Sequence, residues 1–271
     1  MTTTSRQASG TLAAQGLSCG YERRPIIEGM DIAIPDGKVS VIIGANGCGK
    51  STLLKTLARL IRPTAGQVLV DGAAIQSIPT KKLAQRLGLL PQSSLVPDGI
   101  RVCELVARGR FPYQQFMRGL QRSDYEAVAE AMELMGVAEL RDRPVDALSG
   151  GQRQRVWIAM ALAQQTDVLL LDEPTTYLDI AYQVEILDLV RELNRTRGTT
   201  VAMVLHDINL SARYADHMFA LKSGALVAQG APREVVTPEL IREVFDLEAL
   251  VMDDPVSHTP FIVPMSRRRR E

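Results

Sequence analysis

The chain has 271 residues, enough to bury a hydrophobic core in one large domain or two modest ones. Its 31 basic and 31 acidic side chains cancel, which gives no support to a nucleic-acid-binding protein, since such proteins usually carry a basic excess. Three unevenly spaced cysteines, Cys19, Cys48 and Cys103, argue against a disulfide framework and indicate a reducing compartment.

The first ten residues, 1–10, are rich in Ser, Thr and Gln and contain no apolar segment of the kind that a secretion signal needs. We expect a disordered lead there. No apolar run anywhere in the sequence approaches the roughly 20 residues that span a bilayer. The sequence therefore predicts a cytoplasmic protein that reaches a membrane only through a partner.

The next segments alternate between strand-like and helical patterns. Hairpin-like strands with Gly and Asp turns are expected before residue 39 and at 66–71, which suggests an antiparallel edge. The β-branched run 39–43 ends in a Gly-rich turn. A helix is predicted over 50–60, because apolar side chains recur there at helical spacing: Leu53, Leu54, Leu57 and Leu60.

The Gly-rich turn between that strand and that helix is a complete G-x-x-x-x-G-K-[ST] phosphate loop. Its glycines let the backbone wrap closely, so that N–H groups point at phosphate oxygens, while the lysine adds a charge for the β- and γ-phosphates. The Ser hydroxyl suits a Mg²⁺ ligand, and the helix start favours the same anion. The candidate ATP-binding residues are Gly44, Ala45, Asn46, Gly47, Cys48, Gly49, Lys50, Ser51 and Thr52.

A stretch of different character, about residues 100–163, contains no convincing strand and is interpreted as a helical insertion. Helices are predicted over 102–108 and 123–135. Ser123 is the expected N-cap of the second of these, with Glu126 at the third helical position.

The insertion ends with Leu148-Ser-Gly-Gly-Gln152 followed by a helical pattern over 153–163. Ser149 is a candidate N-cap, and Gly150 and Gly151 permit a close approach of the backbone to a ligand. An ordinary capped helix start is the alternative interpretation. The pattern nevertheless predicts a second helix N-terminus that can hold an anion.

An apolar strand, 168–171, leads into two adjacent carboxylates, Asp172 and Glu173. Asp172 is expected near a metal ion, where it orients the ion or its water, and Glu173 is positioned to polarise an attacking water. A strand end of this kind is weak evidence alone, because capped strand ends are common. Beside a phosphate loop it becomes strong.

After this strand the alternation continues. A helix is predicted over 180–193 with one face formed by Ile180, Val184, Leu187 and Val190. A buried strand is expected over 199–205. Unbroken apolar strands separated by helices indicate a mainly parallel sheet.

The C-terminal part is expected to contain a short helix over 238–245 and two weak strands. The sequence ends in a basic tail, Arg267–Arg270. These arginines are interpreted as a solvated, frayed terminus, with contact to anionic lipid as the alternative.

Together, the phosphate loop, the strand ending at Asp172-Glu173, and residues 148–152 just upstream of that strand resemble the ATP-binding cassette (ABC) ATPases. The resemblance covers about residues 16–229. It implies an α/β P-loop NTPase fold with a mainly parallel sheet, an antiparallel β edge subdomain and an inserted α-helical subdomain. The ATPase domain is then expected at 11–250, and a C-terminal arm with the basic tail at 251–271.

The resemblance also assigns roles to single residues. Tyr21 is placed to stack on adenine, and His206 matches the switch histidine that contacts the γ-phosphate beside Glu173. Gln92 contacts Mg²⁺ and links the site to the helical insertion, so the implied metal ligands are Ser51, Gln92 and Asp172. His217 and His258 have no such context and are expected to be structural.

In such proteins two subunits pair head to tail around ATP and Mg²⁺. Ser149 and Gly151 of one subunit then face the γ-phosphate bound at Lys50 of the other. The residues implied to contact ATP in trans are Ser149, Gly150, Gly151, Gln152 and Asp179, of which Asp179 belongs to a loop that crosses the dimer interface. A homodimer of ATPase subunits is expected to bind integral membrane permease subunits at the cytoplasmic face of the inner membrane, and a periplasmic-type binding protein indirectly. No nucleic-acid partner is expected.

Three further stretches, 104–113, 173–182 and 253–260, look like those of the iron-chelate importers, above all the ferric enterobactin and related ferric siderophore ATPases. Cobalamin and haem importers share much of this pattern and remain the alternative cargo. A soluble ABC ATPase of DNA repair or translation usually has two cassettes or long coiled coils, and this sequence has neither. An unrelated P-loop kinase would have no use for residues 148–152.

Overall fold

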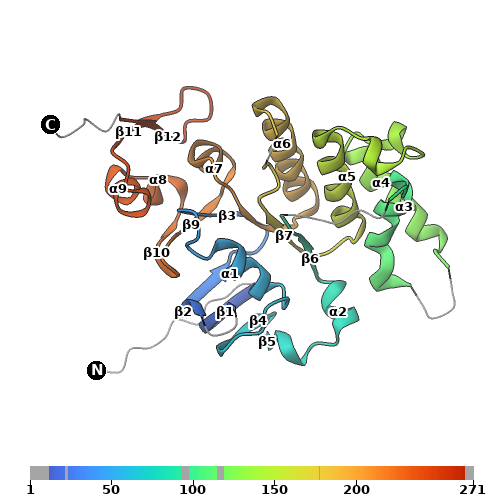
Figure 1. Cartoon of the computed structure of the whole chain (residues 1–271), viewed down its shortest axis with the longest axis horizontal. Coiled ribbons are helices and arrows are strands. Elements are labelled where there is room, and N and C mark those ends of the chain that lie inside the picture. Colours follow the sequence, from blue (N-terminus) through green and yellow to red (C-terminus); the bar gives the residue numbers. More distant parts are fainter. Residues whose placement is uncertain (1–11, 22–23, 93–97, 115–118, 177, 266–271) are drawn as a thin grey trace. The chain divides into compact units, whose positions relative to one another are not determined.

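The computed structural model describes residues 12–21, 24–92, 98–114, 119–176 and 178–265 (Figure 1). The chain divides into two compact units. Unit 1 comprises Met1–Ile78 and His206–Glu271, and unit 2 comprises Pro79–Leu205. Among the described residues, no helix combines the length and the apolar character that crossing a membrane requires. The lead 1–10 and the tail Arg267–Arg270 lie outside the described residues.

Unit 1 contains the expected antiparallel strands. Four of them form a sheet in the order β2-β1-β4-β5, in which every neighbouring pair is antiparallel. Residues on β1 alternate only partly between buried and exposed, because the ladder shifts register near Leu17 and Cys19. The strands are β1 (Leu12–Tyr21), β2 (Arg24–Ile34), β4 (Ala65–Val70) and β5 (Ala73–Ala74).

Unit 1 also holds a second, mainly apolar set of strands. β3 (Val39–Gly44) is buried at all six positions and pairs in parallel with β9 (His217–Lys222), which pairs antiparallel with β10 (Ala225–Gly230). Such continuous burial is typical of a strand covered on both faces. The helical elements of unit 1 are α1 (Lys50–Leu57), η1 (Ile75–Ser77), α7 (Ile208–Tyr214), α8 (Pro232–Val235) and α9 (Pro238–Phe245).

The C-terminal part of unit 1 follows the prediction. α9 covers the expected range, and two strands form a separate antiparallel hairpin, β11 (Ala249–Asp253) and β12 (Pro260–Pro264). The Asn209 side chain of α7 binds the backbone of Ile262 in β12 through two hydrogen bonds. The hairpin is thereby attached to α7.

Unit 2 is built on three parallel strands in the order β8-β7-β6. β7 and β8 are buried throughout, as the apolar runs predict. In the chain α2 precedes β6, and α6 connects β7 to β8. Their bounds are β6 (Leu87–Leu90), β7 (Val168–Asp172), β8 (Thr200–Val204), α2 (Thr80–Ala84) and α6 (Ile180–Arg197).

The predicted helical insertion is confirmed, since the described residues between 100 and 163 contain helices and turns and form no strand longer than one bridge. Its core includes an ion pair in which the Arg110 Nε lies 2.8 Å from the Asp124 Oδ1, with both side chains almost fully buried. The elements are α3 (Val102–Ala107), η2 (Arg108–Tyr113), α4 (Arg122–Leu134), η3 (Ala138–Leu140), η4 (Val145–Ala147) and α5 (Gly150–Ala163).

The predicted start of α4 was wrong. Ser123 is not the N-cap, because the helix begins at Arg122 and is capped at Gln121. The Asp124 Oδ2 accepts the Gln121 backbone N–H at 2.9 Å, while its Oδ1 binds Arg110. A carboxylate at the third helical position therefore fixes the first turn, and Asp124, rather than Glu126, occupies that position.

Two apolar faces also differ from the prediction. α1 ends at Leu57 because Arg59 adopts a left-handed conformation (φ 61°), and the Leu60 N–H donates to the Lys55 carbonyl. The Leu60 side chain is consequently 66% exposed. On α6, Ile180 is 72% exposed, and Ile186, which the predicted stripe omitted, is fully buried.

Candidate functional site

The phosphate loop joins β3 to α1 in unit 1, as predicted. The Lys50 side chain is buried, and its Nζ donates to the carbonyl oxygens of Gly44 at 2.8 Å and Ala45 at 3.1 Å. The ammonium group is therefore held inside the loop by the loop's own backbone. This places a positive charge beside the N–H groups that begin α1.

The loop is packed tightly against other parts of unit 1. At Gly44 the φ is 154°, and a Cβ would lie 2.4 Å from the Leu221 carbonyl oxygen of β9. The turn that follows β9 contacts the loop as well, because the Gly224 N–H donates to the Cys48 carbonyl at 3.0 Å. A Cβ at Gly224 would lie only 1.8 Å from the carbonyl oxygen of Ile26 in β2. Only glycine fits these two positions.

The first turn of α1 has no side-chain cap. Its N-cap is Gly49, which adopts the left-handed conformation (φ 105°) and has no side chain to accept a backbone N–H. The first backbone N–H groups of a helix have no intrahelical acceptor and carry the positive end of the helix dipole. The start of α1 therefore suits an anionic ligand.

The other two predicted residues of unit 1 lie at chain positions that allow ligand contact. Tyr21 ends β1 and is 50% exposed. His206 is exposed and follows β8 by two residues. His217, by contrast, packs edge-on against Phe219 at 4.7 Å between ring centroids, and burial lowers its pKa.

Two carboxylates end β7 in unit 2, as predicted. Asp172 is 1% exposed and Glu173 is 9% exposed. Glu173 adopts a left-handed backbone conformation (φ 55°), which is rare for a residue with a Cβ. Such conformations persist where the surrounding structure enforces them, often at functional sites.

The carboxylate of Glu173 is held by two donors on one oxygen. The Gln92 Nε2 donates to Oε2 at 2.6 Å, and the Thr176 Oγ1 donates to the same oxygen at 3.0 Å. The structure thus brings Gln92 onto Glu173, a contact that the sequence did not predict. Thr176 was missed, although its place three residues after a candidate base is a signal that could have found it.

The second anion-binding candidate, the start of α5, closes its own first turn. The Ser149 Oγ accepts the Gln152 N–H at 3.3 Å, and the Gln152 Oε1 accepts the Ser149 N–H at 3.2 Å. This reciprocal pair confirms Ser149 as the N-cap. Because the hydroxyl oxygen accepts that bond, the hydroxyl hydrogen of Ser149 can be donated to a ligand.

The two glycines of this motif differ. A Cβ at Gly150 would meet no atom within 4 Å, so the backbone there is open to an approaching group. A Cβ at Gly151 would lie 3.4 Å from the Tyr182 ring of α6, so Gly151 instead allows close packing inside unit 2. Gly150 also lines a cleft of about 230 Å³ with Gln92 and Trp157.

Asp179, also predicted, is the N-cap of α6. Its Oδ1 accepts the Tyr182 N–H at 3.1 Å. Asp179 and the first residues of α6 are exposed. The stretch 173–182, which looks like that of the iron-chelate importers, also includes Tyr177. That residue lies outside the described residues.

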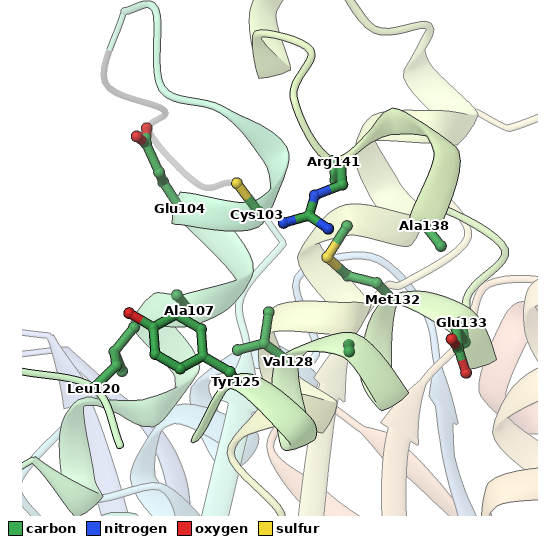
Figure 2. A pocket seen from close by; sticks show the side chains of 11 residues that line it. Cys103, Glu104, Ala107, Leu120, Tyr125, Val128, Met132, Glu133, Ala138 and Arg141 are labelled. Carbon is green, nitrogen blue, oxygen red and sulfur yellow. The ribbon is translucent and has the colours of Figure 1, made fainter. Parts of the chain in front are cut away.

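An apolar groove of about 530 Å³ lies on the helical insertion. Figure 2 shows its wall on α4, where Tyr125, Val128 and Met132 follow one another, with Cys103 and Ala107 of α3 opposite. The spacing of the α4 residues is one helical face. Charged groups are also part of the lining: Glu104, Glu133 and Arg141.

Comparison with known proteins agrees with this arrangement. A family model described as ABC transporter matches residues 27–176. The ferric enterobactin transport ATP-binding protein of Escherichia coli (strain K12) is 52% identical over 256 residues, which cover 94% of each chain. The achromobactin transport ATP-binding protein of Dickeya dadantii (strain 3937) is 51% identical over 95% of this chain and 96% of that one.

Solved structures lead to the same family. An inward-facing putative metal-chelate type ABC transporter matches with a TM-score of 0.83 and 28% identity, over 96% of this chain and 99% of that one. A dimeric bacterial ABC transporter cassette matches with a TM-score of 0.71 and 28% identity, over 81% and 98%. The α/β P-loop fold is thus that of an ATP-hydrolysing cassette, and the chain belongs to the ABC transporter family as an ATP-binding subunit.

Proposed function

We propose that this chain powers the uptake of a ferric siderophore through a separate membrane permease, at the cytoplasmic face of the inner membrane. One observation carries the choice of cargo. Four relatives named for siderophores or their transport are 48–52% identical over 94% or more of the chain. A hemin import ATP-binding protein of Gloeobacter violaceus is 41% identical over a similar share, which favours the siderophore over the haem alternative.

The phosphate loop supports the binding of ATP. Lys50 lies beside the uncapped start of α1, so one positive side chain and several backbone donors are available to the β- and γ-phosphates. Tyr21 offers a half-exposed ring for stacking on adenine. These groups bind and orient the nucleotide without forming a covalent bond to it.

The donor set fits a Mg²⁺ ion that arrives with the nucleotide. Asp172 offers carboxylate oxygens, Ser51 a hydroxyl and Gln92 an amide oxygen, which are the hard oxygen ligands that Mg²⁺ prefers. Among the described residues no cluster of three or more His, Cys, Asp or Glu could hold a metal by itself. This agrees with an ion that takes its other ligands from phosphate and water. The ion would neutralise charge on the β- and γ-phosphates.

Glu173 is the proposed general base for the attacking water. Its side chain is nearly buried, and Gln92 and Thr176 both donate a hydrogen bond to its Oε2, which holds the carboxylate in one orientation. His206 is proposed to contact the γ-phosphate and to stabilise the charge that develops there.

A second subunit is proposed to complete the site. Its Ser149 hydroxyl and the open backbone at Gly150 would face the γ-phosphate bound at Lys50, with Gln152 and Asp179 at the same interface. A shared phosphate would draw the two subunits together, and hydrolysis would release them. This motion would drive the permease and, through it, transfer from a periplasmic-type binding protein.

The groove of Figure 2 is our candidate for the permease contact. A partner helix with apolar residues at i, i+3, i+4 and i+7 would fit its Tyr125–Met132 wall, and Glu104 or Glu133 would favour a basic group on that helix. Replacing Tyr125 and Met132 by Asp should abolish co-purification with the permease but leave the ATP affinity of the isolated chain unchanged. Normal co-purification would refute this placement.

Uptake of radiolabelled iron tests the cargo. Cells that lack this chain should fail to accumulate a ferric siderophore, and plasmid-borne wild-type chain should restore uptake, whereas Glu173→Gln should not. Uptake of haem and of cobalamin serves as the matched control and should not change. Loss of haem or cobalamin uptake with normal siderophore uptake would overturn the assignment.

A further inference from the structure

The C-terminal hairpin of unit 1 has an apolar outer face. In its register Leu250 lies opposite Val263, and Met252 lies opposite Phe261. These side chains are 54%, 39%, 52% and 39% exposed, respectively. On the inner face, Ala249 and Ile262 are each 7% exposed. The outer face is thus a cluster of two directly facing apolar pairs rather than scattered apolar residues.

The backbone of β12 shows which way the strand edges point. The Ile262 N–H donates to the Asn209 Oδ1 at 2.7 Å, and the Asn209 Nδ2 donates to the Ile262 carbonyl at 3.2 Å. Ile262 therefore directs both backbone groups away from β11, which makes Val251–Ile262 a non-hydrogen-bonded pair. Hydrogen bonds from Met265 to Glu248 and from Asp254 to Thr259, both 2.8 Å, belong to the alternate pairs and agree with this pattern.

It follows that β11 also directs the backbone N–H and C=O groups of Ala249, Val251 and Asp253 away from β12. Within the described residues, β11 has no strand neighbour other than β12. In Figure 1 β11 lies on the side of the hairpin away from α7. An edge strand with outward backbone groups and an apolar face is a template for another strand.

We propose that β11 pairs with β11 of a second copy of this chain, antiparallel across a two-fold axis at Val251, and that this pairing needs no nucleotide. A strand that faces its own copy across a two-fold axis is antiparallel to it, and the same residues serve both sides. Leu250 then lies opposite the partner's Met252. The two apolar faces join into one, with four side chains from each copy.

Charge favours a second copy over other occupants. β12 ends at Pro264, beside Ala249 of its own β11, and in the proposed pairing Ala249 lies opposite the partner's Asp253. In the sequence Arg267–Arg270 follow Pro264 by three to six residues, so the chain ties four cations to the strand end that the proposed pairing sets against the partner's Asp253 and Asp254. The pKa values of both carboxyl groups are lowered, by the Arg233 hydrogen bond and by the Val256 N–H respectively, so they are anionic at neutral pH.

Sedimentation of the full chain without nucleotide tests the association. The wild type should show a concentration-dependent monomer–dimer equilibrium. Leu250→Lys combined with Met252→Lys should weaken it at least tenfold, whereas Leu60→Lys, at an equally exposed apolar residue of unit 1, should leave it unchanged. Val251→Pro should also weaken it, because proline removes an N–H that points only outward. A wild type that stays monomeric, or variants that all dimerise equally, would overturn the proposal.

Cysteine pairing tests the register. Residues 250 and 252 of the two copies would form a non-hydrogen-bonded pair about 4.5 Å apart at Cα, within disulfide reach. Residue 250 and its own copy would be diagonal neighbours, about 7–8 Å apart and too far. Mild oxidation of a mixture of Leu250→Cys and Met252→Cys proteins should therefore give a mixed disulfide dimer, and either protein alone should not.

The same variants distinguish other occupants. Equal cross-linking in each single variant would mean random collision and refute the register. Wild-type monomer that binds phosphatidylglycerol vesicles, with binding lost in the double lysine variant, would assign the apolar face to lipid and refute self-pairing. Loss of dimer on replacing Arg267–Arg270 by Gln, without loss of secondary structure, would support the proposed charge contact.

Discussion

The helix starts of the two units handle their backbone N–H groups in opposite ways. In unit 1, α1 begins at Gly49, which offers no side chain, and its first turn lies beside the buried Lys50 ammonium. In unit 2, α5 begins at Ser149, whose hydroxyl and whose partner Gln152 close the first turn reciprocally. A third start, that of α4, is closed by the Asp124 carboxylate.

The difference teaches that the lack of a capping side chain, as much as the presence of a basic group, makes a helix N-terminus a phosphate site. A capped start is stable without a ligand, and its cap satisfies donors that an anion would otherwise bind. An uncapped start leaves those donors to the ligand. By this criterion α1 is the primary site, whereas α5 has only the Ser149 hydroxyl hydrogen and the backbone at Gly150 to offer.

The largest expected effect is the loss of ATP hydrolysis when Glu173, the proposed general base, is replaced. Glu173→Gln keeps the shape of the side chain and its bonds to Gln92 and Thr176 but removes its basicity. ATP hydrolysis should fall by about 10³-fold, within the range for a general base, while ATP binding persists. Steady-state turnover and nucleotide binding by fluorescence would measure both.

The same variant should form ATP-dependent dimers, because the shared phosphate stays in place. Turnover near that of the wild type would remove Glu173 from the catalytic role. A variant that binds ATP but never dimerises, even beside its permease, would contradict the use of α5 as the second anion site.

A matched pair of glycine substitutions tests the construction of the two starts. Gly44→Ala should lower the free energy of unfolding by about 3 kcal/mol, because its φ of 154° is strained for alanine and the new Cβ would meet the Leu221 carbonyl. Gly150→Ala should change it by no more than about 0.5 kcal/mol, since its Cβ meets nothing. Urea denaturation of both proteins gives the answer, and equal stabilities would contradict the comparison.

Two substitutions at Ser149 separate capping from ligand binding. Ser149→Ala should lower ATP hydrolysis by about tenfold, the value of one hydrogen bond to a charged group, and should also cost about 1 kcal/mol of stability through the lost cap. Ser149→Asp keeps the cap and therefore the stability, but its negative charge should repel the phosphate. Hydrolysis by the aspartate variant at or above that of the alanine variant would show that Ser149 only caps.

The smallest effect concerns the start of α4. Burial would raise the pKa of Asp124, but the Gln121 N–H and the Arg110 guanidinium outweigh it, so the pKa is lowered. The stabilisation is therefore present above the ordinary pKa and is lost as the pH falls through the lowered folded-state value. This residue contributes a slope of at most about 1.4 kcal/mol per pH unit.

The check on that slope is the stability difference between the wild type and Asp124→Asn, measured by urea denaturation from pH 7 to pH 3. The difference should shrink below about pH 4, near the ordinary pKa of Asp. A constant difference would mean that the pKa of Asp124 is the same in the folded and the unfolded protein. Arg122→Gln, which removes an exposed ion pair on the same helix, serves as the control.

Sequence patterns predicted the strands and most helices because burial repeats with a fixed period. The runs that became β3, β7 and β8 are short, apolar and fully buried, so no other element competes for them. The same reasoning failed where a single local bond decides the boundary. Asp124 rather than Ser123 sets the start of α4, and the left-handed Arg59 ends α1 before Leu60.

The candidate site was predictable to the level of the motifs but not of their contacts. The spacing of Gly44–Thr52 and the pair Asp172-Glu173 depend on local chain order. The bond from Gln92 to Glu173 joins residues 81 apart in sequence, and the packing of Tyr182 on Gly151 brings two helices together. Such contacts follow from how strands and helices pack, for which one sequence without relatives offers no pattern.

The packing of the phosphate loop has a consequence for engineering. The nine residues of the motif do not define their own shape. The Leu221 carbonyl packs against Gly44, and the Gly224 N–H donates to the Cys48 carbonyl, although both residues lie some 170 positions downstream. A motif transplanted into another strand–helix junction would lack these packing contacts and should bind nucleotide poorly. Larger side chains introduced in the turn after β9 should likewise lower the affinity for nucleotide, although this turn lies outside the motif.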